Sequence, residues 1–270
     1  MLRIGHNPNT NMLPMFHFLD WDNPLLEKVT AEPSGHNRLL EMGEIDLAPI
    51  SSFSYGDHWQ EYAVLPNLSV SNKGRVGSIL LFAKVPLEDL AGRTVALTDL
   101  SATSVHLAKI LLQYFYEVFP TYLTLPSNLE EMFKRADAAL LIGDPAITAE
   151  RSRPGCYIYD LGEEWLRFTG HAMTFAVWAF PQKLIREKAG EVRAVHELLL
   201  AAKTKAQGNW EEIYKACVDM LGVEKSFWQD YFSRFSYDLD QDSVTGLERY
   251  FDFCYELGFL PTRPTLNFWS

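Results

Sequence analysis

Short apolar segments alternate with amphipathic, helix-like segments from the N-terminus to about residue 175. One strongly apolar short segment covers Val76 to Val85, and a stretch with helical periodicity covers Thr103 to Tyr116. Strands that alternate with helices are typical of α/β proteins with mainly parallel sheets. After Pro181 the pattern changes, and four amphipathic helices are predicted at 184–206, 210–221, 225–235 and 242–257. We therefore predict an α/β fold with mixed, mainly parallel sheets, helices on both faces and a helical C-terminal segment.

Two apolar segments, near residues 82–85 and 173–176, are the expected points at which the chain crosses between two halves. If the chain enters a second lobe once and returns once, lobe 1 consists of residues 1–84 and 174–270, and lobe 2 of residues 85–173. In proteins of this layout a ligand binds in the cleft between the lobes, which close by a hinge motion. A single doubly wound domain gives much the same pattern, so both interpretations stay open.

The charge and cysteine content limit the partners and the compartment. The 270-residue chain carries 24 Lys and Arg against 35 Asp and Glu, a formal net charge of −11 with neutral histidine. An acidic surface repels phosphate backbones, so we expect no nucleic-acid partner. No apolar run approaches the ~20 residues of a membrane helix, and we expect no membrane partner. The first residues lack an apolar signal segment, and Cys156, Cys217 and Cys254 form neither a metal clip nor a disulfide framework. These features predict a cytoplasmic protein. They do not determine its oligomeric state.

Small hydroxyl residues follow or interrupt three of the predicted strands. Ser51 and Ser52 follow the strand that ends at Ile50, the segment Ser101–Ser104 precedes a helix, and Ser78 lies in a crossing strand. The N-terminus of a helix offers unpaired N–H groups and a positive dipole end, so it binds a carboxylate or phosphate without a lysine. For each segment alone, a plain helix cap is the simpler interpretation. Three such segments at strand ends, where open α/β sheets bind ligands, favour a binding site.

Other polar residues also follow predicted strands. Asn11 lies in the turn after the first strand, where its amide can bind a ligand or serve turn chemistry. Gly143 and Asp144 end another strand, and Asp144 can cap the following helix, polarise a ligand or close the cleft. His6, at the end of the first strand, can act as a base or be a structural histidine. From residue types alone, the turn, the cap and the structural histidine are the simpler interpretations.

Several catalytic classes have no motif in the sequence. It contains no H-E-x-x-H zinc motif, G-x-S-x-G nucleophile elbow, Walker loop or dinucleotide-binding fingerprint. The glycine-rich segment Gly74–Gly77 leads into a strand rather than a helix, which argues against a phosphate-binding loop. We expect no metal and no cofactor. The residues alone predict a protein that binds a small, anionic molecule.

Five segments together resemble the MqnA/MqnD family, and within it the MqnA branch. They are 43–52 (GEIDLAPISS), 74–81 (GRVGSILL), 97–105 (LTDLSATSV), 138–144 (AALLIGD) and 159–165 (YDLGEEW). The similarity runs from Arg3 to about Trp178, with the segments in the family's order. It implies a two-lobed, periplasmic-binding-protein-like fold of the second type in a cytoplasmic enzyme. It also implies the activity: dehydration of chorismate to 3-[(1-carboxyvinyl)oxy]benzoate in the futalosine route to menaquinone.

The resemblance also assigns residues by position. Asn11 matches the family's asparagine after the first strand, and Ser78 matches the serine of the crossing strand, which implies that both are catalytic. Thr103 and Ser104 match the Thr-Ser pair that opens a helix. Asn9–Thr10 stand where the family usually has an aromatic residue and a leucine. With the strand-end residues, the candidate substrate-binding set is Ser51, Ser52, Thr103, Ser104, Gly143 and Asp144.

The general base and the branch of the family are the open questions. The strand-end candidates include no Asp, Glu or Cys other than Asp144. We therefore hypothesise that the substrate's own enolpyruvyl carboxylate takes the ring proton. One alternative function is that of the sister branch, which forms 1,4-dihydroxy-6-naphthoate from a cyclised futalosine derivative. Another is a non-catalytic small-anion binding protein of the same fold.

Overall fold

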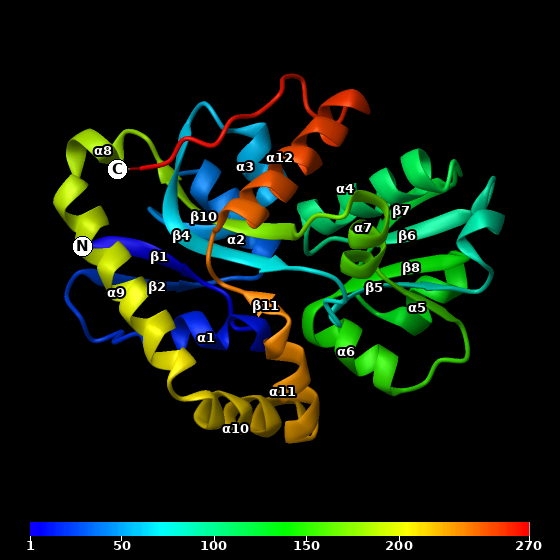
Figure 1. The fold of residues 1–270 in the computed structure, drawn as a ribbon, viewed down its shortest axis with the longest axis horizontal. Helices are drawn as coiled ribbons and strands as arrows, with labels where there is room; N and C mark the ends of the chain where they lie inside the picture. Colours follow the sequence, from blue (N-terminus) through cyan, green and yellow to red (C-terminus); the bar gives the residue numbers. More distant parts are fainter. Residues whose placement is uncertain (270) are drawn as a thin grey trace.

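The computed structural model describes residues 1–269, which form three β-sheets. The smallest sheet pairs β1 (Leu2–His6) with β2 (Leu26–Thr30). The four-stranded sheet has the order β11 (Phe235–Ser236), β4 (Tyr62–Asn72), β10 (Met173–Pro181) and β3 (Ala48–Ser51). The five-stranded sheet has the order β7 (Thr121–Leu125), β6 (Thr94–Thr98), β8 (Ala138–Ile142), β5 (Ile79–Ala83) and β9 (Tyr157–Asp160). In Figure 1 the four-stranded sheet lies to the left of the five-stranded sheet.

Helices lie between and around the sheets. Those of the first part are η1 (Thr10–Met12), α1 (Leu13–Phe16), α2 (Pro33–Glu41), α3 (Ser52–Asp57) and η2 (Leu87–Leu90). Those of the middle part are α4 (Ala102–Ile110), the π-helical turn η3 (Leu111–Phe115), α5 (Leu129–Arg135), α6 (Gly143–Arg151) and α7 (Leu161–Thr169). The C-terminal helices are α8 (Leu184–Glu187), α9 (Ala189–Gln207), α10 (Trp210–Leu221), α11 (Lys225–Ser233) and α12 (Gln241–Glu256). The predicted helical C-terminal segment is thus confirmed, with its first helix interrupted at Lys188.

The five-stranded sheet is covered on both faces, as predicted. In β5, Leu80 and Phe82 pack in one apolar cluster, whereas Leu81 and Ala83 pack in another. Successive side chains of a strand point to opposite faces, so an apolar strand without alternation belongs to a sheet that is buried on both sides. This explains why the segment around β5 is strongly apolar.

The sheets are mixed, but the prediction that they are mainly parallel is wrong. Within residues 1–269 the pairs β1–β2, β6–β7 and β6–β8 are parallel, and the other pairs of strands are antiparallel. The antiparallel pairs of β5 and β10 arise because these strands carry the chain from one sheet to the other. Each therefore runs against the strands beside it. The alternation of strands and helices in the sequence carries no information about these directions.

One crossing point lies earlier in the chain than predicted. Strand β5 pairs with β8 and β9 in the five-stranded sheet, so the chain changes sheet before Ile79 and not after residue 84. An apolar strand can join either sheet, so its composition did not decide the boundary. The return occurs at β10, which begins at Met173, close to the predicted position 174. The division into two lobes remains our proposal for how the molecule is organised.

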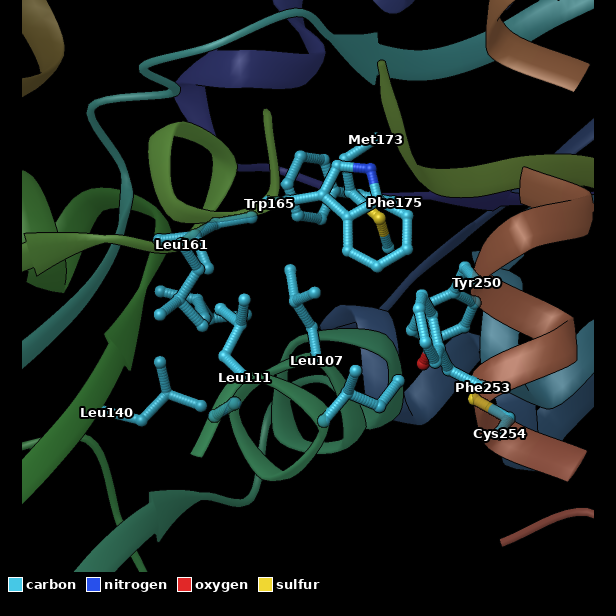
Figure 2. Packing of buried hydrophobic residues seen from close by; sticks show 14 of the residues in the cluster. Leu107, Leu111, Leu140, Leu161, Trp165, Met173, Phe175, Tyr250, Phe253 and Cys254 are labelled. Atoms are coloured by element: carbon cyan, nitrogen blue, oxygen red, sulfur yellow. The ribbon is translucent and has the colours of Figure 1, made fainter. Parts of the chain in front are cut away.

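A single apolar cluster connects the two larger sheets. Figure 2 shows its central part, where Leu140 of β8 and Leu107 of α4 face Trp165 of α7 and Phe175 of β10. Tyr250 of α12 closes the cluster on the other side. Each fully buried side chain of this size contributes about 1.5–3 kcal/mol. The crossing region is therefore a packed core, and Phe175 of this core also lines the cavity described below.

Candidate active site

A cavity lies at the carboxyl ends of four strands. Its lining includes Asn7 after β1, Ser51 at the end of β3, Ser101 after β6 and Gly143 after β8. The empty volume is about 650 Å³, including the part that is open to solvent. Open α/β sheets bind ligands at this edge. This cavity is the candidate active site.

Hydroxyl and amide groups form the polar part of the cavity wall. The polar lining residues are Asn7, Asn9, Asn11, Ser51, Ser78, Ser101 and Ser104. Apolar side chains, among them Met12, Phe175 and Phe235, form the rest of the wall. Within residues 1–269 no Asp, Glu, His, Lys or Arg lines the cavity. A ligand in this cavity is therefore contacted by dipoles and not by charged side chains.

Ser51 reaches the cavity from the junction of β3 and α3. Its backbone N–H donates to Oδ1 of Asn37 (3.0 Å), and the Asn37 amide nitrogen donates to Oγ of Ser51 (3.1 Å). Asn37 lies on α2, which packs against β3. The two hydrogen bonds hold Ser51 in one orientation at the cavity wall, where it is 4% exposed.

Ser78 lies directly before β5, where the chain enters the five-stranded sheet. Its Oγ is 2.7 Å from the phenolic oxygen of Tyr231 on α11, and burial raises the pKa of this tyrosine. The Ser78 carbonyl accepts a hydrogen bond from the backbone N–H of Gly143 (2.7 Å). Gly143 has φ +63°, a left-handed conformation that favours glycine. These contacts connect the start of β5 to the start of α6 at the cavity wall.

The N-terminus of α4 also points to the cavity. The hydroxyl of the N-cap Ser101 accepts from the backbone N–H of Ser104 (3.2 Å) and donates to Oγ of Ser104 (3.1 Å). Both serines line the cavity. The remaining N–H groups of the first turn and the positive end of the helix dipole favour an anion at this position.

Asn11 lies in the 3₁₀ turn η1 and lines the cavity. Its carbonyl oxygen accepts a hydrogen bond from the hydroxyl of Tyr237 (2.5 Å). Within residues 1–269 no hydrogen bond involves its side-chain amide, which leaves a donor and an acceptor for a ligand. The neighbouring turn residues Asn7 and Asn9 are joined by a hydrogen bond from the Asn9 backbone N–H to Oδ1 of Asn7 (3.0 Å).

Ser52 and Thr103 were predicted to bind substrate, but neither lines the cavity. Ser52 is fully buried and donates to the carbonyl oxygen of Thr174 (2.7 Å). Thr103 is also fully buried, donates to the carbonyl oxygen of Phe175 (2.9 Å) and accepts from the backbone N–H of Phe53 (3.2 Å). In this structure both hydroxyls connect secondary-structure elements.

Asp144 does not cap a helix, so the interpretation that the sequence favours is wrong. Helix α6 begins one residue earlier, at Gly143, and has no side-chain cap. The Asp144 carboxylate accepts hydrogen bonds from the Thr10 hydroxyl (2.5 Å) and the Thr10 backbone N–H (3.3 Å). Burial raises the pKa of this carboxyl, and the Thr10 hydrogen bonds lower it in part. Asp144 thus joins η1 to α6 beside the cavity.

His6 lies next to the site but not in its wall. Its ring packs against Phe16 and Trp21, with centroid distances of 4.9 Å and 5.5 Å, and its Nδ1 is 3.2 Å from the hydroxyl of Thr30. Burial, with a smaller effect of Lys28, lowers the pKa of His6 to about 4. These surroundings are those of a structural, neutral histidine.

Three further features concern residues 1–269 as a whole. No group of three or more His, Cys, Asp or Glu side chains in this range is placed to hold a metal ion. No helix in the described part of the chain combines the length and the apolar character needed to cross a bilayer. Cys156, Cys217 and Cys254 are free thiols.

The sequence of residues 2–256 matches a protein family described as menaquinone biosynthesis. The chain belongs to this family. A relative from Thermus thermophilus, named chorismate dehydratase, is 33% identical over an alignment of 262 residues, and the match covers 92% of this chain and 93% of the relative. The family resemblance of the sequence is thereby confirmed.

Solved structures place this menaquinone-biosynthesis family member in a known fold. A protein from Archaeoglobus fulgidus is 19% identical, with a TM-score of 0.74 over 96% of this chain and 98% of its own. The periplasmic aliphatic sulphonate binding protein SsuA of Escherichia coli is 17% identical, with a TM-score of 0.66 over 97% of this chain and 94% of its own. The predicted periplasmic-binding-protein-like fold is confirmed.

The structure brings most of the predicted site residues of this family member around one cavity. The predicted residues that line it are Asn11, Ser51, Ser78, Ser104 and Gly143. Three further residues that line it were not predicted as site residues: Asn7, Asn9 and Ser101. They lie in the same two sequence segments as Asn11 and Ser104. Asn37, which holds Ser51, had no signal in the sequence because its role depends on the packing of α2 against β3.

Proposed function

We propose that the protein is a chorismate dehydratase, which converts chorismate into 3-[(1-carboxyvinyl)oxy]benzoate and water. The proposal rests on the 33% identity to the Thermus thermophilus enzyme of that name over nearly the whole chain. We place the reaction in the cavity at the strand ends, with chorismate as the small-molecule substrate. The three free thiols fit our proposal that this enzyme acts in the cytosol.

The chemistry of the cavity supports this substrate. Chorismate is a dicarboxylate, and the wall offers serine hydroxyls, asparagine amides and the N-terminus of α4. These groups bind carboxylates through hydrogen bonds and the helix dipole, although the chain as a whole has a net charge of −11.

The reaction needs a base, and the cavity wall within residues 1–269 has no ionisable side chain. We infer that the enolpyruvyl carboxylate of the substrate takes the proton from the neighbouring ring carbon. The C–O bond of the adjacent hydroxyl breaks, the protonated enolpyruvyl carboxyl gives the same proton to the leaving hydroxide to form water, and the ring becomes aromatic. The protein then has two tasks, to hold the carboxylate beside the proton and to donate hydrogen bonds to the leaving oxygen. Asn11 and Ser78 line the cavity, and we assign these tasks to them.

The direct test is to incubate the purified protein with chorismate and to follow the absorbance of an aromatic product, with product identity checked by mass spectrometry. We expect the loss of one water from chorismate. Binding of chorismate without turnover would instead indicate a small-anion binding protein. Turnover of a cyclised futalosine derivative, with none of chorismate, would assign the sister activity.

A second measurement tests the source of the base. We expect His6→Asn and Asp144→Asn to keep most of the turnover, because neither residue lines the cavity. If either variant binds substrate normally but loses nearly all turnover, a side chain of the protein is the base.

A further inference from the structure

Serine hydroxyls at the cavity wall share an arrangement that the overall activity does not require. Ser51, Ser78 and Ser104 each lie beside a second polar group of the protein. A hydroxyl has one proton to donate and can also accept. Whether such a serine offers its proton or its lone pairs to a ligand therefore depends on that second group.

The direction is best determined at Ser51. The Ser51 backbone N–H can only donate, and it donates to Oδ1 of Asn37 (3.0 Å). This fixes which end of the Asn37 amide is the oxygen, so the NH₂ group faces Oγ of Ser51 (3.1 Å) and donates to it. Because the Asn37 nitrogen cannot accept, the proton of Ser51 must point elsewhere, and Ser51 lines the cavity.

The hydroxyls of Ser78 and Ser104 likewise accept a hydrogen bond from a neighbouring group. Tyr231 is 1% exposed, and within residues 1–269 its hydroxyl has Ser78 as its one hydrogen-bond partner (2.7 Å). A buried phenol proton without an acceptor is costly, so Tyr231 donates to Ser78. At α4, the hydroxyl of Ser101 donates to Oγ of Ser104 (3.1 Å). The protons of Ser78 and Ser104 are thus left for the cavity.

We propose that Asn37, Tyr231 and Ser101 are positioning residues that turn these serine hydroxyls into hydrogen-bond donors toward the ligand. The inference rests on the proposed function and names the feature by which the site selects its substrate. A wall that presents donors favours carboxylate oxygens and disfavours the N–H groups of an amide. It gives the site anion selectivity without a lysine or an arginine in the wall.

Asn37→Asp is the informative variant. The new carboxylate still accepts from the Ser51 backbone N–H, so the local fold is kept. Its second oxygen, however, accepts from the Ser51 hydroxyl and turns the proton away from the cavity. We expect the Kd for isophthalate, a stable benzene dicarboxylate, to rise about tenfold to hundredfold, because a hydrogen bond to a charged group is lost. The KM for chorismate rises more than kcat falls.

The added negative charge of Asn37→Asp could weaken anion binding directly, so the experiment is a double-mutant cycle with Ser51→Ala. If Asn37 acts through the Ser51 hydroxyl, Asn37→Asp changes the isophthalate Kd by less than about twofold once residue 51 is alanine. Binding of the neutral isophthalamide by Asn37→Asp stays as in the wild type or improves. An equal loss in both backgrounds, or no loss in either, overturns the proposal.

Two further arms keep the result decisive. If Asn37→Asp does not fold, a cycle is run with Tyr231→Phe and Ser78→Ala. Tyr231→Phe removes the donor that orients Ser78, so it weakens isophthalate binding when residue 78 is serine and has no effect when it is alanine; an equal change in both backgrounds, or no change in either, overturns the proposal. Because isophthalate binding is measured without turnover, the cycle can fail while chorismate is still dehydrated, and the reverse. Failure of the inference and failure of the proposed function are therefore distinguishable.

Discussion

Ser51 and Ser52 are neighbours in the chain and both are buried, yet their hydroxyls have opposite surroundings. Ser51 receives a hydrogen bond from Asn37 and lines the cavity, whereas Ser52 gives its proton to the carbonyl oxygen of Thr174. The same contrast occurs at the next pair. Ser104 receives from Ser101 at the cavity wall, and Thr103 donates to the carbonyl oxygen of Phe175 in the interior.

We call Ser51, Ser78 and Ser104 the cavity hydroxyls, and Ser52 and Thr103 the interior hydroxyls. An interior hydroxyl has already used its proton on a backbone carbonyl and has nothing to donate to a ligand. A cavity hydroxyl is oriented by an incoming hydrogen bond and keeps its proton. All five residues are buried and carry a hydroxyl, so the partner of the hydroxyl decides whether the residue serves the fold or the site.

The largest effect is expected at Thr103. Thr103→Val keeps the shape but leaves the Phe175 carbonyl and the Phe53 N–H without this partner. At about 1–3 kcal/mol for each of these two buried groups, we expect the free energy of unfolding to fall by about 2–6 kcal/mol. Urea unfolding measures this loss, and Thr103→Ser, which keeps the hydroxyl, is the control. An unchanged stability with a raised KM would move Thr103 to the cavity hydroxyls, as the family resemblance implies.

A smaller and more selective effect is expected from the serine pair. Ser52→Ala removes the donor to the Thr174 carbonyl, so we expect a loss of about 1–3 kcal/mol in stability and an unchanged KM. Ser51→Ala removes a donor to the ligand, so we expect KM for chorismate to rise about tenfold with a stability change below about 1 kcal/mol. Urea unfolding and steady-state kinetics on both variants check this. Equal effects of the two variants on KM would remove the distinction between the groups.

The contrast also explains how far the sequence could predict this site. The strand-end serines marked the right edge of the sheets, because ends of strands and starts of helices are visible in local patterns. Which serine of a pair faces the ligand was not visible, because the partners are remote: Ser52 and Thr174 are 122 positions apart. Asp144 and Thr10 are 134 positions apart, so a local cap was the only contact that the sequence could offer for Asp144.

Strand β4 has no clear signal in the sequence, for a local reason. Strand β4 (Tyr62–Asn72) is the partner of β10 and β11, but Pro66 and Asn67 interrupt its apolar pattern. Asn67 has φ +60°, and the pairing of β4 with β10 shifts register between Val177 and Ala179. Such a bulge looks like a turn in the sequence, because proline and asparagine are typical turn residues.

The smallest expected effect concerns Asp144, a carboxylate beside the cavity. Burial raises the pKa of Asp144 above its ordinary value of 3.8, so between these two values the folded protein holds more protons than the unfolded chain. By linkage, the contribution of Asp144 to stability is fully present below the unfolded pKa and is lost as pH rises through the folded pKa. We therefore expect the free energy of unfolding of the wild type, relative to Asp144→Asn, to fall as pH rises from about 4 toward neutrality.

Urea unfolding of both proteins across this pH range gives the sign. A difference that falls with pH means that desolvation of Asp144 outweighs its hydrogen bonds from Thr10. A difference that rises with pH means that the Thr10 hydroxyl and N–H stabilise the ionised carboxylate more than burial opposes it. In the second case the Thr10 hydroxyl, like the interior hydroxyls, has used its proton within the protein, but on a charged carboxylate. The contact between η1 and α6 would then weaken in acid instead of strengthening.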